Sequence, residues 1–170
     1  MGKLIVLEGT DGSGKSTQFA LLKQRLEREG TAFQTLVFPQ YSEPSSALIR
    51  MYLGGEFGSN PGDVNAYAAS TFYAVDRYAS YRKAWGEYYR QGGLIVSDRY
   101  TSSNAVHQAA KLREPMRPDF YRWLYDLEFV RLLVSYEYFR IHILRPYGDI
   151  KTGTLFNDRI HVENSVPCYK

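Results

Sequence analysis

The sequence predicts a three-layer α/β fold, in which helices flank a parallel β-sheet. Two short apolar segments, at residues 4–7 and 94–97, have the composition of strands that are buried on both faces, as the strands of a parallel sheet are. Segments with helical periodicity separate them, and the order strand, helix, strand, helix, strand is typical of a parallel sheet. A length of 170 residues suits one domain.

The first strand leads through a glycine-rich turn into a helix predicted at residues 16–29. Phe19, Leu22 and Leu26 recur at helical spacing and are expected on one face. Gly30 follows as the residue type that commonly ends a helix. The strand, the turn and the helix therefore form the first unit of the predicted fold.

The remaining elements are predicted from periodicity and from the positions of proline and glycine. In order, they are a strand at 33–38, a helix at 44–53, a long helical stretch at 65–91, a strand at 94–97, helices at 103–111 and 119–133, and a strand at 138–144. The last strand is predicted because Phe139, Ile141 and Ile143 alternate with Arg140 and His142. Beyond this strand neither helical nor strand periodicity persists.

Composition and charge exclude several classes of protein. The formal net charge is +3 and no continuous basic stripe is present, so no nucleic-acid partner is expected. No segment approaches the roughly 20 apolar residues that cross a bilayer, so no membrane partner is expected. The single cysteine, Cys168, cannot form an internal disulfide bond, which predicts a reducing compartment and hence a cytoplasmic protein.

Residues 9–16 read GTDGSGKS and match the phosphate-binding pattern G-x-x-x-x-G-K-[ST]. The pattern follows a predicted buried strand and precedes a predicted helix, which is the context that phosphate binding requires. Glycines let backbone N–H groups point into the loop, and the helix N-terminus adds a positive dipole. A glycine-rich turn without a ligand is the alternative, which this context disfavours. The predicted ATP-binding residues are Gly9, Thr10, Asp11, Gly12, Ser13, Gly14, Lys15, Ser16 and Thr17.

Three charged residues are predicted to act on the phosphates. Lys15 is expected to reach the β- and γ-phosphates as a mobile point charge, and the Ser16 hydroxyl to ligate Mg²⁺. Asp98 ends a predicted strand, where an acidic residue commonly supports the metal. Arg99 is expected to contact the transferred phosphate oxygens, with a surface salt bridge as the alternative. Lys15, Asp98 and Arg99 are thus the predicted catalytic residues, and Ser16 and Asp98 the predicted metal ligands.

A phosphate-binding loop occurs in switch GTPases, motor ATPases and small-molecule kinases. The chain contains no guanine-reading N-K-x-D motif, and larger ATPases usually need a longer chain. A small-molecule kinase is therefore the economical interpretation. The alternative from another class is a regulatory protein whose nucleotide state controls a partner, but no exposed amphipathic segment is predicted for such a partner.

Several motifs occur in a fixed order along the chain. They are EGTDGSGKST at 8–17, FPQY at 38–41, STFYAVDRY at 70–78, SDRYTSSNAVHQ at 97–108 and WLYDLEF at 123–129. Together they resemble the thymidylate kinase (dTMP kinase) family across residues 3–129. The resemblance implies a P-loop NTPase fold and the phosphorylation of dTMP to dTDP with ATP and Mg²⁺. It also implies a homodimer that forms through helices, to which the tyrosine-rich stretch 67–89 would contribute.

The resemblance also implies an acceptor site. Asp11 would contact the deoxyribose 3′-hydroxyl, Tyr73 would stack on thymine, and Arg77 would bind a polar edge of the base. The other predicted substrate-binding residues are Phe38, Tyr100, Ser103 and Gln108. Two alternatives stay open at this point. Tyr73 could belong to the core, and Arg77 could form a solvated charge pair with Asp76.

The chain departs from the family pattern at two points of the phosphate site. Gln40 and Tyr41 stand where the family often has an arginine that holds the acceptor phosphate, and Arg50 is the candidate substitute. Gly12 stands where one branch of the family has an arginine. Chains without that arginine usually supply a catalytic arginine from a flexible lid, which we expect after the fourth strand.

Residues 130–170 do not follow the family pattern, which usually continues with a strand resembling DLVIYLDV and an arginine-rich lid. We therefore predict a kinase domain at 1–129 and a divergent segment at 130–170 that leaves the fold incomplete, with a frameshift or truncation as the hypothesis. Arg145, Lys151 and Arg159 are the basic candidates in this segment. The alternatives to a dTMP kinase are a kinase for a related deoxynucleoside or deoxynucleotide, and a lid-less ATP-binding remnant of little activity.

Overall fold

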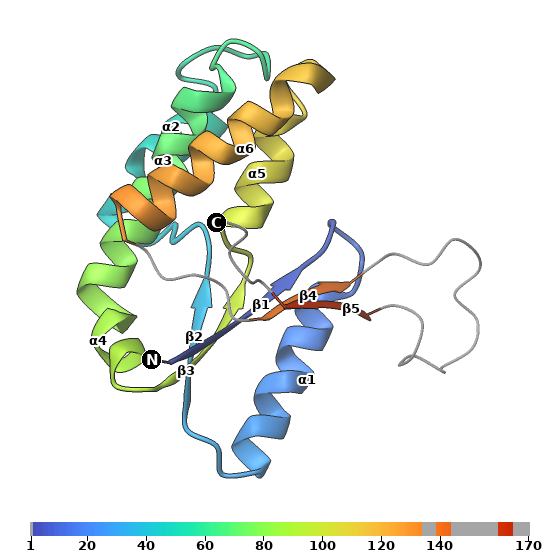
Figure 1. The fold of residues 1–170 in the computed structure, drawn as a ribbon, viewed down its shortest axis with the longest axis vertical. Coiled ribbons are helices and arrows are strands. Elements are labelled where there is room, and N and C mark those ends of the chain that lie inside the picture. Colours follow the sequence, from blue (N-terminus) through green and yellow to red (C-terminus); the bar gives the residue numbers. More distant parts are fainter. Residues whose placement is uncertain (1, 134–138, 144–159, 165–170) are drawn as a thin grey trace, which may run out of the picture. The chain divides into compact units, whose positions relative to one another are not determined.

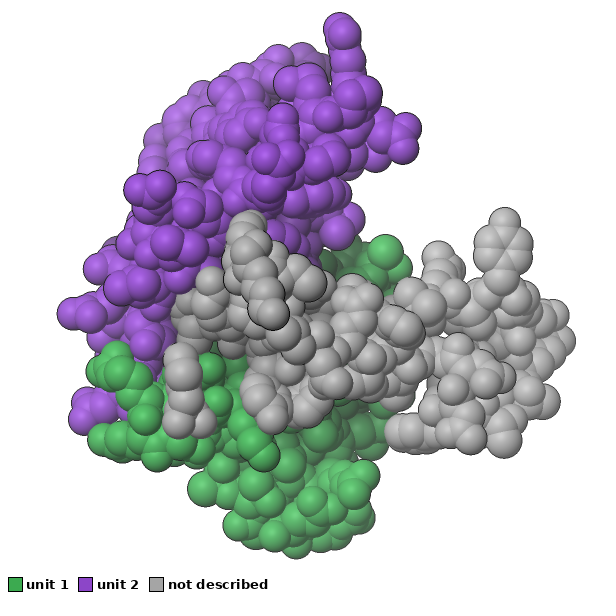
Figure 2. Space-filling model, viewed as in Figure 1, with its two compact units in different colours: residues 1–36, 88–99, 136–170 green, residues 37–87, 100–135 purple. Residues whose placement is uncertain are grey.

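The computed structural model describes residues 2–133, 139–143 and 160–164 of the chain. The chain divides into two units (Figure 2). The sheet unit comprises Met1–Leu36, Tyr88–Arg99 and Tyr136–Lys170, and the helical unit comprises Val37–Glu87 and Tyr100–Ser135. Each unit has a hydrophobic core of its own.

The strands form a five-stranded sheet in the order β2-β3-β1-β4-β5 (Figure 1). Their bounds are Lys3–Glu8 for β1, Phe33–Val37 for β2, Leu94–Asp98 for β3, Phe139–Ile143 for β4 and Ile160–Asn164 for β5. Strand β1 pairs in parallel with β3 on one side and with β4 on the other, whereas β5 is antiparallel to β4. The register places Leu7 opposite Asp98, so the carboxyl ends of β1 and β3 lie side by side.

Helix α1, Lys15–Arg28, covers the central strands of the sheet unit (Figure 1). Its apolar residues at helical spacing, Phe19, Leu22 and Leu26, pack on the buried pair Leu7 and Val96. The helix ends as the sequence predicts, because Gly30 has a φ of +66° and its N–H donates to a carbonyl of the last turn. Burial of this apolar face fixes α1 on the sheet.

The helical unit consists of α-helices joined by short 3-10 and π-helical segments. They are η1 Pro44–Ser46, α2 Ala47–Leu53, α3 Ala66–Ser80, η2 Tyr81–Trp85, α5 Thr101–Ala109, η3 Glu114–Met116, α6 Arg117–Tyr125 and η4 Asp126–Arg131. Helix α4, Gly86–Arg90, continues η2 across the division between the units. Ala66, Ala105, Ala109, Phe120 and Leu124 from α3, α5 and α6 form the core of this unit. No described helix is both long and apolar enough to span a membrane.

Most predicted elements are present with small changes in their bounds. The helical stretch at 65–91 is continuous but contains the π-helical segment η2, and the helix predicted at 119–133 ends in the π-helical segment η4. The strand predicted at 138–144 is confirmed as β4. Strand β5 contradicts the expectation that periodicity ends after β4. Its five residues pair antiparallel with β4 through the backbone. Ile160 and Val162 do alternate with His161 and Glu163, but this short pattern stands alone in a stretch without further periodicity, so it was not recognised as a strand.

The core of the helical unit yields a stability prediction. Phe120 is fully buried among aromatic rings and small side chains, so Phe120→Ala should lower the free energy of unfolding by about 3–5 kcal/mol. Met116, one turn earlier, is 48% exposed, and Met116→Ala should change it by less than about 0.5 kcal/mol. Urea unfolding followed by circular dichroism measures both. Equal effects of the two substitutions would contradict this description of the core.

Candidate functional site

The loop between β1 and α1 has the backbone conformation of a phosphate-binding loop. Gly12 and Gly14 have φ angles of +77° and +89°, in the left-handed region that residues with a Cβ atom rarely adopt. No heavy atom lies within 4 Å of a Cβ built on either glycine. The backbone conformation, rather than crowding, therefore requires glycine at both positions, and space remains beside the loop for a ligand.

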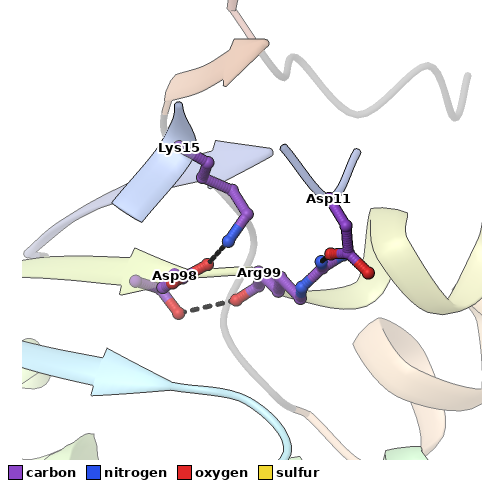
Figure 3. A network of polar contacts seen from close by, with 5 residues as sticks. Asp11, Lys15, Asp98 and Arg99 are labelled. Carbon is purple, nitrogen blue, oxygen red and sulfur yellow. Dashed lines mark hydrogen bonds and ion pairs between the residues drawn. The ribbon is translucent and has the colours of Figure 1, made fainter. Parts of the chain in front are cut away.

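Lys15 and Asp98 form an ion pair at the carboxyl end of the sheet (Figure 3). Lys15 begins α1, and Asp98 ends β3 directly opposite Leu7 of β1. Their side chains are only 8% and 15% exposed, so water screens the two charges weakly. The predicted catalytic lysine and the predicted metal-binding aspartate are thus brought together, although 83 positions separate them in the sequence.

Arg99 lies beside the same loop (Figure 3). Its Nη2 donates to Asp11 Oδ1 at 2.7 Å. Its backbone has a φ of +67°, and its N–H donates to the Leu7 carbonyl oxygen while its own carbonyl oxygen accepts from Ser97 Oγ. The ordered backbone directs the side chain of Arg99 toward the loop. The surface salt bridge considered for Arg99 is present, and its partner, Asp11, is itself a residue of the phosphate loop.

The residues around the loop fit a magnesium–triphosphate ligand. Ser16 is exposed on the first turn of α1, and the Ser13 hydroxyl is buried without a hydrogen-bond partner among the described residues. Within the same part of the chain, no group of three or more His, Cys, Asp or Glu side chains is close enough to hold a metal ion. Oxygen donors such as Ser16 and Asp98 suit Mg²⁺, which usually takes its other ligands from water and phosphate.

The helical unit contains a buried ion pair between Arg77 of α3 and Glu128 of η4. Arg77 Nε donates to Glu128 Oε2 at 2.6 Å, and Nη2 pairs with Oε1. Thr101 Oγ1 donates to Glu128 Oε2 at 2.8 Å. Burial alone would lower the pKa of Arg77, but the charge and hydrogen bonds of Glu128 outweigh burial and raise it. Arg77 therefore carries a positive charge inside the protein.

The environment of Asp76 excludes the alternative that Arg77 forms a solvated charge pair with it. Asp76 is buried and accepts hydrogen bonds from the Gln40 N–H at 2.9 Å and from Ser45 Oγ at 2.6 Å. The alternative of a solvated pair between Arg77 and Asp76 is wrong, because both side chains are buried and neighbours on one helix point in different directions. Asp76 instead holds the segment after β2 against α3.

Tyr73 is half-buried, one helical turn before Arg77 on α3. Burial raises the pKa of Tyr73, the nearby Tyr52 and Tyr41 add to this effect, and Arg77 opposes it, so that the pKa is about 12. The ring is therefore neutral at physiological pH. A partly exposed neutral ring suits stacking better than a fully buried core position would.

Several buried polar atoms lie between α3 and α5 without a partner. They are Ser70 Oγ, Asn104 Oδ1 and Gln108 Oε1, among the described residues. Asn104 Nδ2 donates to the Ser70 carbonyl oxygen at 3.3 Å, which connects the two helices. Native proteins pair most buried polar atoms, so these atoms retain hydrogen-bonding capacity for a further polar partner, such as water or a ligand.

The other predicted substrate-binding residues also belong to the helical unit. Phe38 and Tyr100 are buried, with their rings edge to face at 5.8 Å between centroids. Ser103 is half-buried on α5. Arg50 does not project freely, because its Nη1 donates to carbonyl oxygens of the segment at 41–43. Arg145, Lys151 and Arg159 lie outside the described residues.

Sequence reasoning missed four residues of the helical unit: Ser70, Thr101, Asn104 and Glu128. A signal was present for some of them, since Thr101, Asn104 and Gln108 recur at helical spacing and define one polar face of α5. No comparable signal identifies Glu128, because its partner is 51 positions away.

Comparison with known proteins identifies the family of the chain. A sequence model of the thymidylate kinase family matches residues 7–121. The chain belongs to the thymidylate kinase family. It is 35% identical over 130 residues to thymidylate kinase of Mycobacterium tuberculosis strain H37Rv, covering 76% of this chain and 59% of that protein. It is 32% identical over 106 residues to a probable thymidylate kinase of Pyrobaculum aerophilum, which covers 62% of this chain and 50% of that protein.

Structural comparison gives the same fold. The structure of thymidylate kinase from Candida albicans matches with a TM-score of 0.60 at 23% identity, over 85% of this chain and 63% of that chain. The predicted P-loop NTPase fold of the α/β class, with a parallel sheet flanked by helices, is thereby confirmed. The chain spans less than two thirds of the length of each of these relatives of the family.

The environment of Tyr73 predicts a pH dependence of stability. Because its pKa rises from 10.0 to about 12 on folding, the native state retains a proton that the unfolded state loses between these values. The free energy of unfolding should therefore fall as the pH rises from about 10 toward 12. In Tyr73→Phe the free energy of unfolding should fall less over this pH range. Urea unfolding of both proteins at pH 8, 10 and 11 measures the difference. Identical slopes for both proteins would show that Tyr73 titrates normally.

Proposed function

We propose that the chain transfers the γ-phosphoryl group of ATP to dTMP, giving ADP and dTDP. In this reaction the bond from the γ-phosphorus to the bridging oxygen of ADP breaks, and a bond to an oxygen of the dTMP phosphate forms. The observation that carries the proposal is the pairing of Lys15 with Asp98 beside a glycine loop of phosphate-binding conformation, in a chain of the thymidylate kinase family.

The loop at 9–17 is proposed to hold the ATP phosphates. Its glycines, in the left-handed conformation, allow backbone N–H groups to turn toward the phosphates, and the start of α1 adds a positive dipole. Lys15 is expected to exchange Asp98 for the β- and γ-phosphates, which carry more negative charge than one carboxylate. When bound by Ser16, Asp98 and the phosphates, Mg²⁺ would neutralise charge on the phosphate oxygens.

Arg99 and Asp11 are proposed to act at the acceptor phosphate and the sugar. Arg99 can donate hydrogen bonds to phosphate oxygens, which stabilises the charge that develops during transfer. The carboxylate of Asp11 is almost fully exposed and accepts from Arg99 Nη2. It has further acceptor capacity for the 3′-hydroxyl of the deoxyribose.

The helical unit is proposed to bind thymine. The neutral ring of Tyr73 supports stacking, and Arg77 can donate to a base oxygen. In thymine a ring N–H lies beside the base oxygen, and the unpartnered Oδ1 of Asn104 can accept a hydrogen bond from it. Arg77 and Asn104 thus match a base edge that carries an oxygen acceptor next to a ring N–H donor. Thymine has such an edge, whereas cytosine has an amino group in place of the oxygen, so the site favours thymine. Phe38, Tyr100, Ser103 and Gln108 would complete the walls.

Three further proposals concern the whole protein. The division into a kinase domain at 1–129 and a divergent segment at 130–170 agrees with a family match that ends at residue 121, although β4 joins the sheet through β1.

A homodimer through helices is consistent with Val75 and Tyr78 on α3, which are 49% and 39% exposed. We also propose a cytoplasmic location, because the single cysteine suits a reducing compartment.

The decisive experiment measures ADP release by the purified chain with MgATP, with and without dTMP. Release should rise with dTMP and fall by about 10³-fold or more in Lys15→Ala, because the lysine contacts the transferred phosphoryl group. Arg25→Ala is the matched control, since it removes an exposed cation from the same helix.

Each outcome is informative. Stimulation by dTMP that depends on Lys15 and not on Arg25 supports the kinase. A folded chain that binds ATP without stimulation contradicts phosphoryl transfer to dTMP and favours an ATP-binding remnant. Stimulation by another deoxynucleotide or deoxynucleoside instead of dTMP would replace the proposed acceptor.

A further inference from the structure

We propose that Glu128 is a positioning residue which, together with Thr101, fixes the guanidinium of Arg77 so that it selects a base with an oxygen acceptor. The inference rests on the proposed function, because it assumes that Arg77 meets the base. It adds to that function a residue from a π-helical segment near the end of the family match.

The geometry of the pair fixes the plane of the guanidinium. Glu128 binds Arg77 with both carboxylate oxygens, through Nε and Nη2. Two parallel bonds of this kind define an orientation, whereas one bond would allow rotation. Among the described residues, the bonds to Glu128 leave Nη1 as the amino group of Arg77 that can serve a ligand.

Two other side chains restrict the pair. Thr101 Oγ1 donates to Glu128 Oε2 at 2.8 Å, so the carboxylate itself cannot rotate freely. The ring of Tyr100 lies 5.9 Å from Arg77 Cζ, at a cation–π distance. The arginine is therefore held through its hydrogen bonds and by a ring beside its carbon.

Stability alone does not account for this arrangement. Phe120, Leu124 and Glu128 follow at four-residue spacing and are all fully buried, so a carboxylate occupies a position of an otherwise apolar face. Burying two charges costs several kcal/mol, and well-packed hydrophobic residues often serve stability as well as a buried ion pair does. A reason beyond packing is needed for the charge at position 128.

The surroundings of Arg77 supply that reason. Ser70, Tyr73 and Arg77 follow at spacings of three and four on α3, so they share a face. Ser70 Oγ and the facing Asn104 Oδ1 are buried polar atoms without partners. The fixed arginine thus shares a helix face with Ser70, whose hydroxyl has unused hydrogen-bonding capacity among the described residues. The π-helical turn at Glu128, a feature frequent at functional sites, is a second indication.

Selection of the base follows from the positive charge and the fixed orientation of the Arg77 guanidinium. A base that presents an oxygen toward Arg77 accepts its hydrogen bond. A base with an amino group at that place, as in cytosine, presents a donor to a donor and leaves both unpaired. A loosely held arginine could turn away from the amino group, so the strength of the discrimination depends on Glu128 and Thr101.

Glu128→Gln tests the inference, because the amide replaces one acceptor by a donor that faces the arginine. The KM for dTMP should rise about tenfold, and the preference for dTMP over dCMP in kcat/KM should fall about tenfold. The KM for ATP should change less than about twofold. Asp126→Asn is the matched control, since it removes an exposed ion-paired carboxylate from the same π-helical segment. It should alter none of these values.

Thr101 provides a second, milder pair of variants in case Glu128→Gln does not fold. Thr101→Val removes the hydroxyl that bonds Glu128 and should reduce the dTMP preference about threefold, while Thr101→Ser retains the hydroxyl and should restore it. Calorimetric binding of dTMP and dCMP to each variant gives the same comparison without turnover.

The outcomes separate the inference from the proposed function. If wild type binds or phosphorylates dTMP but the Glu128 and Thr101 variants keep its preference over dCMP, the inference is overturned and the kinase stands. If the KM values for ATP and dTMP rise equally with unchanged preference, Glu128 has only a structural role, which also overturns it. A wild-type chain that neither binds nor phosphorylates dTMP overturns both.

Discussion

The parallel pairing of β1 with β3 is the constraint on which the phosphate site depends. Their register sets Leu7 opposite Asp98, so the loop that follows β1 begins beside the acidic end of β3. Lys15, at the start of the next helix, can then reach Asp98. The Arg99 N–H continues the pairing by donating to the Leu7 carbonyl oxygen, which brings its side chain to Asp11. One backbone register thereby assembles four charged side chains.

The two principal ion pairs differ in a way that suits different tasks. Lys15 and Asp98 retain some exposure and lie beside a loop with open space, which suits the proposed exchange of either partner for phosphate or metal. Arg77 and Glu128 are 2% and 0% exposed and joined by two hydrogen bonds, with Thr101 as a third partner. Separating them would leave an uncompensated buried charge, which is strongly unfavourable. The first pair therefore suits the exchange proposed for it, and the second suits a fixed position.

Local patterns in the sequence predicted most of the fold. Helix α1 followed from the spacing of Phe19, Leu22 and Leu26, because the same period governs burial on a helix face. Strand β4 followed from alternation. Strand β5 did not, because the alternation of Ile160 and Val162 with His161 and Glu163 stands alone in a stretch without further periodicity, and only the backbone pairing with β4 identifies it as a strand. The π-helical segments were also missed, since an i to i+5 bond such as that between the Leu132 N–H and the Leu127 carbonyl oxygen leaves no mark in composition.

The sequence by itself determined the phosphate loop, its lysine and the family, because these depend on residues that are contiguous or in ordered motifs. The need for glycine at positions 12 and 14 is likewise local, since it arises from the φ angles of single residues. Only the tertiary structure decided that Arg77 pairs with Glu128 and not with the adjacent Asp76. The physical reason is that ion pairing depends on distance in space. The packing of α3 against η4 closes a separation of 51 positions that no sequence pattern records.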